Sequence, residues 1–306
     1  MNTYLLCNSV RKLLNSKSLI IAGLARDCEV YLKSLLPFFA SFQQHFKSVR
    51  YVFVENDSLD DTKSLLGAFN PGNTSIICLD GLHHIPERTK RIEIARNAYL
   101  ELIRNTAKLR SADFLMVCDL DDVLKNLHLN MFLDQFMLVA HHEADAIFPN
   151  TLPDYYDLWA LRAKGICEVD VFQNFAAHLV SGGNASDSFL GSKMPLSFSK
   201  TEGLIPVRSA FGGIGIYNMQ TIVNSACEYV GTRLVSFKDQ RNQVFYSMAQ
   251  VCEHVAFHQG LGVLGAKLCI NPKFVINDQC RISLQIEKTL IDAYKDFSGN
   301  PIFRPK

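Results

Sequence analysis

The residues best suited to chemistry are two aspartates, Asp119 and Asp121, in the segment CDLDD. They follow the apolar run FLMVC, which predicts a buried strand over residues 114–118. Carboxylates two residues apart at a strand end can turn toward one cation, and Mg2+ or Mn2+ prefers oxygen ligands together with substrate phosphates. The pattern therefore predicts a metal site, while a strand end followed by capping acids is the structural alternative.

The same segment also resembles the nucleophile loop of haloacid-dehalogenase-type phosphatases. In that chemistry the first aspartate, here Asp119, attacks phosphate and the second donates a proton. The loop of those enzymes follows the first strand, whereas three strand-like segments precede it here. The position in the chain therefore favours the metal site over the phosphatase interpretation.

A second polar cluster, ENDS at residues 55–58, follows the strand-like run at residues 49–54. The Glu55 side chain could accept hydrogen bonds from a nucleobase or a ribose, because nucleotide pockets place a few polar groups to fix orientation. Asp57 and Ser58 also have the chemistry of a helix N-cap. The two uses are compatible, because the cap needs one residue and leaves Glu55 available.

Arginines recur along a predicted helix over residues 87–109: Arg88, Arg91 and Arg96, with Asn97 beside the last of them. Arginines near a diphosphate supply bidentate, charge-assisted hydrogen bonds without titrating. For any single arginine, a solvated helix face is the default interpretation. The cluster is therefore a candidate phosphate-binding face only in combination with the other motifs.

Two segments of the second half could complete a site. Gly212 and Gly213, in FGGIGIY, would allow a close approach to a ligand or a positive φ, and a simple turn explains them equally well. In CEHVAFH, Glu253 could be a general base or bind a substrate hydroxyl, while His254 or His258 could complete the coordination of a cation. The histidines would share a face if the segment were a helix, and a loop is also compatible with it.

The elements that must position these residues alternate between strand-like and helix-like patterns, which predicts a mostly parallel sheet covered by helices. Ligands of such sheets bind outside the carboxyl ends of the strands, where the aspartates are expected. Pro37 is expected to break the first helix or to begin a second one. The predicted strands are residues 18–25, 49–54, 75–79 and 114–118, and the predicted helices of the same region include residues 29–46 and 87–109.

Composition excludes some functions. The 306 residues include 31 basic and 30 acidic ones, a balance that predicts no broad nucleic-acid footprint. The nine cysteines form no CxxC pair, so we expect free thiols and a reducing compartment. Without a recognisable secretory signal or an apolar stretch long enough to span a bilayer, we expect a cytoplasmic protein, with peripheral membrane contact left open.

Taken in order, the motifs resemble those of the GT-A glycosyltransferases. The resemblance lies in ARD (25–27), VENDSLDDT (54–62), RIEIARNAYL (91–100) and VCDLDD (117–122). The later YYDLWALR, FGGIGIY, CEHVAFH and INP are similar to segments of fungal capsule-associated mannosyltransferases and related bacterial or viral sugar transferases. The first group of motifs covers roughly the first half of the chain, and the second group is less specific.

The resemblance implies an α/β fold of the GT-A, Rossmann-like type, with a mostly parallel central sheet flanked by helices in one elaborated domain. Its parts would be an N-terminal extension (1–17), a nucleotide-sugar-binding half (18–150) and an acceptor-binding and C-terminal part (151–306). The implied activity is Mn2+- or Mg2+-dependent transfer of a sugar from a UDP- or GDP-sugar donor to a glycan or glycolipid acceptor. The implied partners include no nucleic acid.

The resemblance also assigns roles to residues. Asp119 and Asp121 would be the DxD metal ligands with His258 as a third ligand, Glu253 and Asp121 would be catalytic, and Gly212 and Gly213 would shape the acceptor side. The donor would be bound by Ala25, Arg26, Glu55, Arg91, Arg96, Asn97, Asp119 and Leu120.

This chain departs from the family pattern at one segment, because CEH stands in place of the usual Glu-Asp pair. Two histidines, His254 and His258, consequently compete for one role. Besides the phosphatase, a second alternative is a scaffold that keeps the transferase fold and binds sugar nucleotides or glycans without catalysis. Selectivity for the nucleobase and the sugar would depend on a pocket formed by residues that are distant in the chain.

Overall fold

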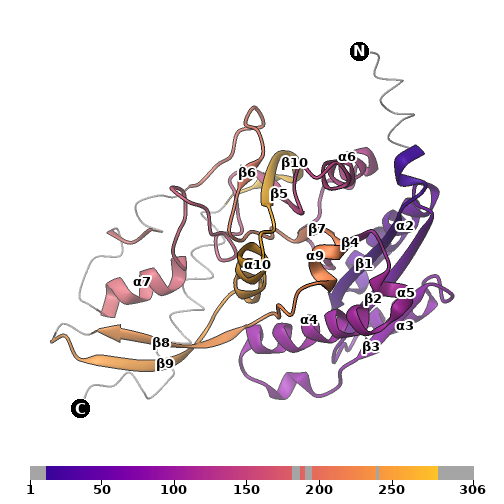
Figure 1. The fold of residues 1–306 in the computed structure, drawn as a ribbon. Coiled ribbons are helices and arrows are strands. Elements are labelled where there is room, and N and C mark those ends of the chain that lie inside the picture. The colour runs from indigo at the N-terminus through magenta and orange to yellow at the C-terminus, as the bar shows by residue number, and fades with distance from the viewer. Residues whose placement is uncertain (1–11, 181–186, 190–194, 239–240, 282–306) are drawn as a thin grey trace.

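The computed structural model of the chain describes residues 12–180, 187–189, 195–238 and 241–281. Most of the expected N-terminal extension (1–17) and the end of the chain lie outside the described residues. An eight-stranded sheet in the order β3-β2-β1-β4-β7-β5-β10-β6 forms the centre of the molecule (Figure 1). Its strands are β1 (Ser18–Ala25), β2 (Ser48–Glu55), β3 (Thr74–Cys78), β4 (Phe114–Asp119), β5 (Ala146–Pro153), β6 (Ile205–Pro206), β7 (Ile214–Asn218) and β10 (Leu268–Cys280).

The sheet is mostly parallel, as the alternating pattern indicates. Strands β3, β2, β1 and β4 run parallel to one another, and β10 runs parallel to β5. Strand β7 is antiparallel to both β4 and β5, and the short β6 is antiparallel to β10. The four strands predicted in the first half all form, within one residue of the expected ends.

Helices cover both faces of the sheet. Successive side chains of a strand point to opposite faces, so each strand contributes side chains to both. On β1, Leu19 and Ile21 pack on the face covered by α2 and α6, whereas Ile20 and Ala22 pack on the face covered by α4 and α10. Each face therefore has its own apolar core. The helices named here are α2 (Glu29–Ser41), α4 (Arg88–Asn105), α6 (Leu129–Ala140) and α10 (Glu253–Val263).

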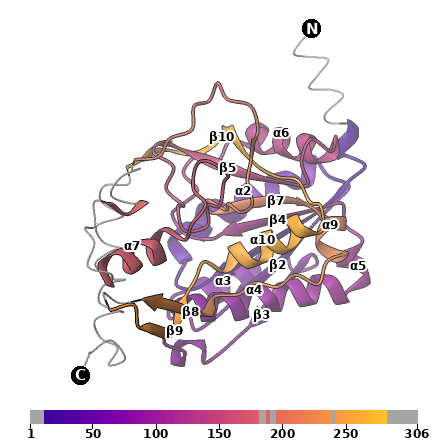
Figure 2. The same ribbon diagram turned by 60° about the vertical axis from the view of Figure 1, so that its left-hand side comes forward.

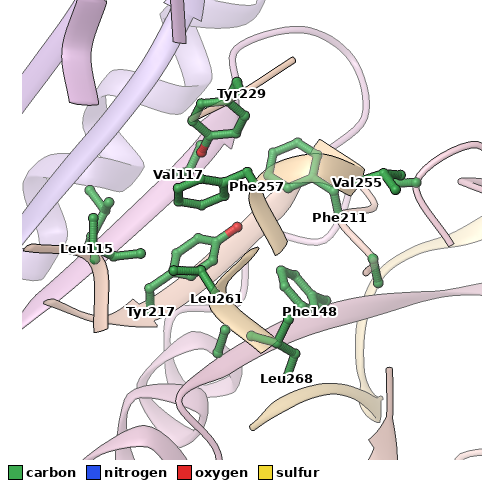
Figure 3. Close-up of a cluster of buried hydrophobic side chains, with 14 of the residues drawn as sticks. Leu115, Val117, Phe148, Phe211, Tyr217, Tyr229, Val255, Phe257, Leu261 and Leu268 are labelled. Atoms are coloured by element: carbon green, nitrogen blue, oxygen red, sulfur yellow. The ribbon is translucent and has the colours of Figure 1, made fainter. Parts of the chain in front are cut away.

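Figure 3 shows part of the core on the α10 face. Phe257 and Leu261 of α10 are fully buried and lie over Phe148 and Tyr217 of the sheet. The ring of Phe257 also stacks on that of Tyr229, with 4.3 Å between centroids. This packing fixes the position of α10, whose first residues belong to the CEHVAFH motif. The segment that could be read as helix or loop is thus a helix.

The prediction that Pro37 breaks the first helix is wrong. Helix α2 runs continuously past Pro37 and is followed by the 3-10 turn η1 (Phe42–Gln44). Proline removes one backbone donor and so frees the carbonyl four residues earlier. Because Lys33 and Pro37 are both exposed, that carbonyl lies on the solvent side of the helix, where water can satisfy it.

The second half contains elements that the sequence patterns did not predict. Residues 171–180 form a helix inside a region that looks irregular in sequence, and a two-stranded ribbon of β8 and β9 extends from the body of the protein beside that helix (Figure 2). One face of the ribbon is exposed and apolar, with Leu234 opposite Met248. The remaining elements are α3 (Thr62–Ala68), η2 (Leu82–His84), α5 (Ala107–Arg110), α7 (Val171–Val180), α9 (Met219–Val223), β8 (Thr232–Lys238) and β9 (Val244–Gln250).

Two further expectations concern the whole chain. The eight cysteines that the structure describes are all free, and six of them are buried, as their apolar surroundings predict. No helix within the described residues is long and apolar enough to cross a membrane.

Candidate active site

A cavity of about 430 Å³ lies at the carboxyl ends of β1 and β4, the edge of the sheet where the sequence places the aspartates. One wall comes from the end of β1 and one face of α4. The opposite wall comes from the segments after β5 and before β7, together with the start of α10. The site residues predicted from sequence that line it are Ala25, Arg26, Arg91, Arg96, Asp119, Leu120, Asp121 and Glu253.

The two aspartates at the tip of β4 lie in the cavity with their backbone held in place. The Asp119 N–H donates to the Gly213 carbonyl at 2.8 Å, and the Asp121 Oδ1 accepts from the Val123 N–H at 3.2 Å. Burial raises the pKa of Asp119 to about 7, although Arg96 opposes the shift. Burial also raises the pKa of Asp121. Ionising either carboxyl group therefore costs free energy until a cation binds beside it.

Arg96 connects both sides of the cavity. Its Nη2 donates to Asp119 Oδ1 at 2.9 Å, and its Nε donates to Glu253 Oε1 at 2.8 Å. The guanidinium lies 4.9 Å from the centre of the Phe211 ring and is only 3% exposed. Its Nη1 has no hydrogen-bond partner among the described residues. A buried guanidinium with an unused donor in a cavity is suited to bind an anionic oxygen.

The side chains in the cavity offer oxygen ligands for the expected divalent cation. Among the described residues no ready-made group of three or more His, Cys, Asp and Glu ligands exists. Asp119 and Asp121 supply carboxylate oxygens, which are the ligands that Mg2+ and Mn2+ prefer. Magnesium in particular is commonly held by one or two carboxylates, with substrate phosphates and water completing its shell. The two aspartates therefore fit a cation that arrives with a phosphate ligand.

Four arginines form the cationic wall. Arg88, Arg91 and Arg96 lie on one face of α4, and Arg26 follows the end of β1. Arg91 is oriented by its Nη1, which donates to the carbonyl of Ile85 at 2.5 Å. The charge of Arg88 lowers the pKa of Asp121 and so opposes the effect of burial. This wall is positive where a diphosphate would approach the aspartates.

The opposite wall is held by Asp157, in the YYDLWALR segment. Its Oδ2 accepts from the Gly212 N–H at 2.7 Å, and its Oδ1 accepts from the Ala160 N–H at 3.2 Å. Burial raises the pKa of Asp157. Gly212 and Gly213 have φ values of +65° and +89°, and a Cβ on Gly213 would collide with Val123. The glycine pair thus allows a turn that hydrogen-bonds to both Asp157 and Asp119. The glycines themselves do not line the cavity.

The start of α10 places two residues at the cavity. Glu253 is 6% exposed and His254 is 2% exposed. The His254 ring stacks on Phe211 with 3.7 Å between centroids, and its Nε2 lies 3.4 Å from Glu253 Oε1. Neither ring nitrogen has a hydrogen-bond partner within the described part of the chain. Burial and the charge of Arg96 lower the pKa of His254 well below its usual value, so the imidazole is neutral.

The structure does not place His258 at the cavity, where the resemblance implies a metal ligand. His258 is fully buried one turn after His254, and it does not line the cavity. Its Nε2 lies 2.8 Å from the Tyr217 hydroxyl, and its Nδ1 lies 3.1 Å from the Ser209 hydroxyl. Burial lowers the pKa of His258 to about 3. Helical spacing alone could not tell which of the two histidines faces the site.

Asn97 and Glu55 also lie outside the cavity lining, contrary to their expected contacts with the donor. Asn97 Nδ2 donates to the Tyr229 carbonyl at 3.0 Å, and its Oδ1 accepts from the Tyr229 N–H at 2.9 Å. Both polar groups therefore anchor the chain before β8. Glu55 is buried, and its Oε1 accepts from the Ser58 N–H at 2.9 Å, so that it caps a turn. Its neighbour Asn56 lines the cavity instead.

Arg88 and His254, which the sequence names as candidates, also line the cavity. Other lining residues were not singled out from the sequence. No sequence pattern marks the aromatic residues as part of a site, because regularly spaced aromatic side chains more often belong to the hydrophobic core. The additional lining residues are Leu24, Cys28, Asn56, Ile92, Ala95, Tyr156, Asp157, Trp159, Phe211 and Cys252.

No family model matches the chain, and no curated protein matches it. Solved structures similar to it include S. aureus TarS 1-349, with 11% identity, a TM-score of 0.45, and coverage of 92% of this chain and 72% of that one. Glucosyl-3-phosphoglycerate synthase from Mycobacterium tuberculosis, in complex with UDP, has 12% identity, a TM-score of 0.40, and coverage of 94% and 83%. Mannosyltransferase PcManGT from Pyrobaculum calidifontis, in complex with GDP-Man and Mn2+, has 10% identity, a TM-score of 0.48, and coverage of 95% and 68%.

The identities and TM-scores of these structures carry no activity over to this chain. The fold class follows from the chain's own sheet, which is mostly parallel and flanked by helices on both faces. The residues that bear on its function line the cavity.

Proposed function

We propose that the chain is a divalent-cation-dependent glycosyltransferase that moves a sugar from a nucleoside diphosphate donor to an acceptor hydroxyl. The observation that carries the proposal is the arrangement around Arg96. Two strand-tip carboxylates, Asp119 and Asp121, share one cavity with a buried guanidinium that has an unused donor. A diphosphate bound there would supply an anionic oxygen to the unpaired Arg96 Nη1.

The reaction breaks the bond between the anomeric carbon and the diphosphate oxygen, and the bonding electrons leave with the nucleoside diphosphate. A cation held by Asp119 and Asp121 would neutralise the charge that grows on those phosphates. Arg96 and Arg91 would bind phosphate oxygens from the α4 side, and Ala25, Arg26 and Leu120 would contact the nucleotide. Stabilisation of the leaving group is thus the principal catalytic contribution of this wall.

Glu253 is the proposed acceptor of the proton from the attacking hydroxyl if the reaction inverts the anomeric centre. It lines the wall opposite the donor arginines, and Arg96 holds its carboxylate at 2.8 Å. The hydroxyl oxygen forms the new bond to the anomeric carbon while its proton passes to a carboxylate oxygen. If the configuration is retained, Glu253 positions the acceptor.

The phosphatase alternative is disfavoured by two observations. Asp119 ends the fourth strand along the chain, and its Oδ1 accepts a charge-assisted hydrogen bond from Arg96. This ion pair would have to rearrange before that oxygen could attack phosphate. A phosphatase would form a phospho-aspartate at Asp119 that beryllium fluoride traps, and it would release inorganic phosphate from sugar phosphates.

A thermal-shift titration tests the proposed function. UDP, GDP and their glucose and mannose conjugates are each added with and without Mn2+. A ligand that binds only the folded state raises the melting temperature. We expect at least one nucleotide to do so in a Mn2+-dependent manner, and transfer to a sugar acceptor to follow. Melting temperatures that none of these ligands changes would contradict the proposal, and tight binding without hydrolysis or transfer would favour a scaffold.

A further inference from the structure

Charge is distributed unevenly around the cavity. Among the described lining residues the cations are Arg26, Arg88, Arg91 and Arg96, all from the β1 end or α4. In the sheet order, β4 separates β1 from β7 and β5, so the aspartates lie between this wall and the opposite one. The charge of Arg96 is offset by its two carboxylate partners. The far wall therefore carries no uncompensated positive charge among the described residues.

The far wall is aromatic and acidic. Tyr156, Trp159 and Phe211 line it, together with the carboxyl group of Asp157. Arg162, the cation nearest to Asp157 in the chain, is bound to Asp170 at 2.9 Å and is buried behind the wall. Aromatic rings offer flat apolar surfaces, and carboxyl groups accept hydrogen bonds from hydroxyls. Such a surface complements a sugar ring, which has an apolar face and a rim of hydroxyl groups.

Two polar groups of this wall have no partner within the described residues. One is the Nε1–H of Trp159, and the other is the imidazole of His254, whose two nitrogens are both unsatisfied. Leaving a buried polar group unpaired destabilises the free protein. His254 is held in place by its stacking on Phe211, so it cannot turn freely to find a partner. A neutral imidazole offers one donor and one acceptor, which is the pairing that a hydroxyl group requires.

We infer that the far wall of the cavity is the acceptor subsite and that it selects an uncharged sugar, bound against Tyr156 and Trp159 with its hydroxyls hydrogen-bonded by the Trp159 Nε1–H and His254. The inference rests on the proposed function, because it names the acceptor of that reaction. An acceptor carrying a phosphate or a carboxylate would place negative charge beside Asp157 and Glu253. Juxtaposed like charges exclude such partners.

The chain provides its own reporter for a binding experiment, because Trp159 is its only tryptophan. The protein is saturated with UDP or GDP and Mn2+, and neutral methyl glycosides of glucose, galactose, mannose and xylose are titrated while Trp159 emission is followed. Each hexoside is compared with an anionic twin, the corresponding sugar 6-phosphate or uronic acid. We expect a saturable change with at least one neutral sugar, and affinity for its anionic twins weaker by about tenfold or more.

The outcomes separate this inference from the proposed function. If no nucleotide binds, both fail. If a nucleotide binds but an anionic twin binds as tightly as its neutral partner, or no neutral sugar binds, the acceptor inference is overturned and the proposed function stands. Transfer assays with the same sugars must give the same ranking in kcat/KM.

A matched pair of variants tests the role of His254. His254→Phe keeps the stacking on Phe211 but cannot hydrogen-bond, so we expect the acceptor KM to rise at least about fivefold while nucleotide affinity and melting temperature are retained. His258→Phe makes the same change one turn later and removes the partners of Tyr217 and Ser209. It should lower the melting temperature and leave the acceptor KM unchanged. The opposite pattern would overturn the assignment of His254, and His254→Gln, which retains hydrogen bonding, should recover the KM.

Discussion

Asp121 has no ion-pair partner within the part of the chain that the structure describes, and burial raises its pKa. The negative charge of Asp121 therefore destabilises the metal-free protein, and a bound cation would offset this effect. We expect Asp121→Asn to reduce transfer by about 100-fold or more, since the metal supplies several kcal/mol to the transition state. The melting temperature without metal should be unchanged or higher, because a functional site gives up stability for activity.

The neighbouring residue provides the control for this change. Asp122 is largely exposed, and its Oδ2 lies 3.5 Å from the Lys125 ammonium. Exposed pairs of this type contribute at most about 1 kcal/mol. Asp122→Asn should keep both transfer and the stabilisation by Mn2+. Full, metal-dependent turnover in Asp121→Asn would contradict the site assignment.

Asp119 makes metal binding depend on pH. Burial raises its pKa to about 7, and the cation requires the ionised carboxylate. Protons therefore compete with the metal below pH 7, and the apparent Mn2+ affinity should fall by up to about tenfold for each pH unit as the pH decreases. Calorimetric titration with Mn2+ at several pH values measures this slope. An affinity that stays constant between pH 6 and 8 would show that Asp119 is not a ligand.

The same shift affects the stability of the metal-free protein. A raised pKa means that the folded state binds the Asp119 proton more tightly than the unfolded state does. The contribution of this group to stability is therefore fully present below the unfolded pKa, near 4, and is lost as the pH rises through about 7. Added Mn2+ should stabilise the protein most at the upper end of this range.

Among the elements, the turn before β7 is the most sensitive to the size of one side chain. Gly213 has a φ of +89°, and a Cβ there would collide with Val123. Gly265 has a similar φ of +92°, but open space surrounds the place where its Cβ would lie. The two positions differ in packing and not in backbone conformation.

Substituting alanine for Gly213 and for Gly265 should therefore lower the free energy of unfolding by different amounts. Gly265→Ala should lower the free energy of unfolding by about 1 kcal/mol, which is the cost of a left-handed backbone for a residue with Cβ. Gly213→Ala should lower it by about 3 kcal/mol, because overpacking adds to the same backbone cost. It should also weaken Mn2+ binding, since the Gly213 carbonyl accepts from the Asp119 N–H. Denaturant unfolding measures both losses, and equal losses would contradict the steric argument.

Strands were easier to predict from the sequence than the connections between them. Runs such as SLIIAGLA and FLMVC are apolar throughout because strands of this sheet are buried on both faces, and their ends locate the aspartates. The helix α7 and the ribbon of β8 and β9 were missed, because part of their apolar surface faces solvent or each other and gives no clear period. Local patterns therefore predict the first half of the fold better than the second.

Within the site, the sequence correctly predicted the residues that directly follow strand ends. It did not predict the role of residues for which the direction of the side chain decides whether they face the cavity. Asp119 and Asp121 follow a strand end, so the sheet edge places them without further information. His254 and His258 lie one turn apart on the same helix face, yet one lines the cavity and the other is bonded within the core. Only the packing of α10 against the sheet distinguishes them.

On the scale of the whole molecule, Arg96 joins the two halves of the chain. It lies on α4 in the first half, binds Asp119 of β4, and binds Glu253 of α10 in the second half. Removing one partner of a buried ion pair leaves uncompensated buried charge, which costs roughly 3 to 5 kcal/mol. We expect Arg96→Met to lower the free energy of unfolding by about that amount at neutral pH.

Acidification should reduce the loss. Without Arg96, the Asp119 and Glu253 carboxyl groups take up protons more readily, so that lowering the pH removes the buried negative charge and the variant approaches the wild type. The matched control for this prediction is Arg104→Met, on the same helix. The Arg104 guanidinium donates to the carbonyls of Ile222 and Cys227 and to the Ser225 hydroxyl, none of which titrates between pH 5 and pH 7. Denaturant unfolding of both variants at pH 7 and pH 5 should show a pH-dependent loss for Arg96→Met and a constant loss for Arg104→Met. Equal losses at both pH values in the two variants would mean that Arg96 acts through packing and hydrogen bonds, and not through the charge of the two carboxylates that it joins.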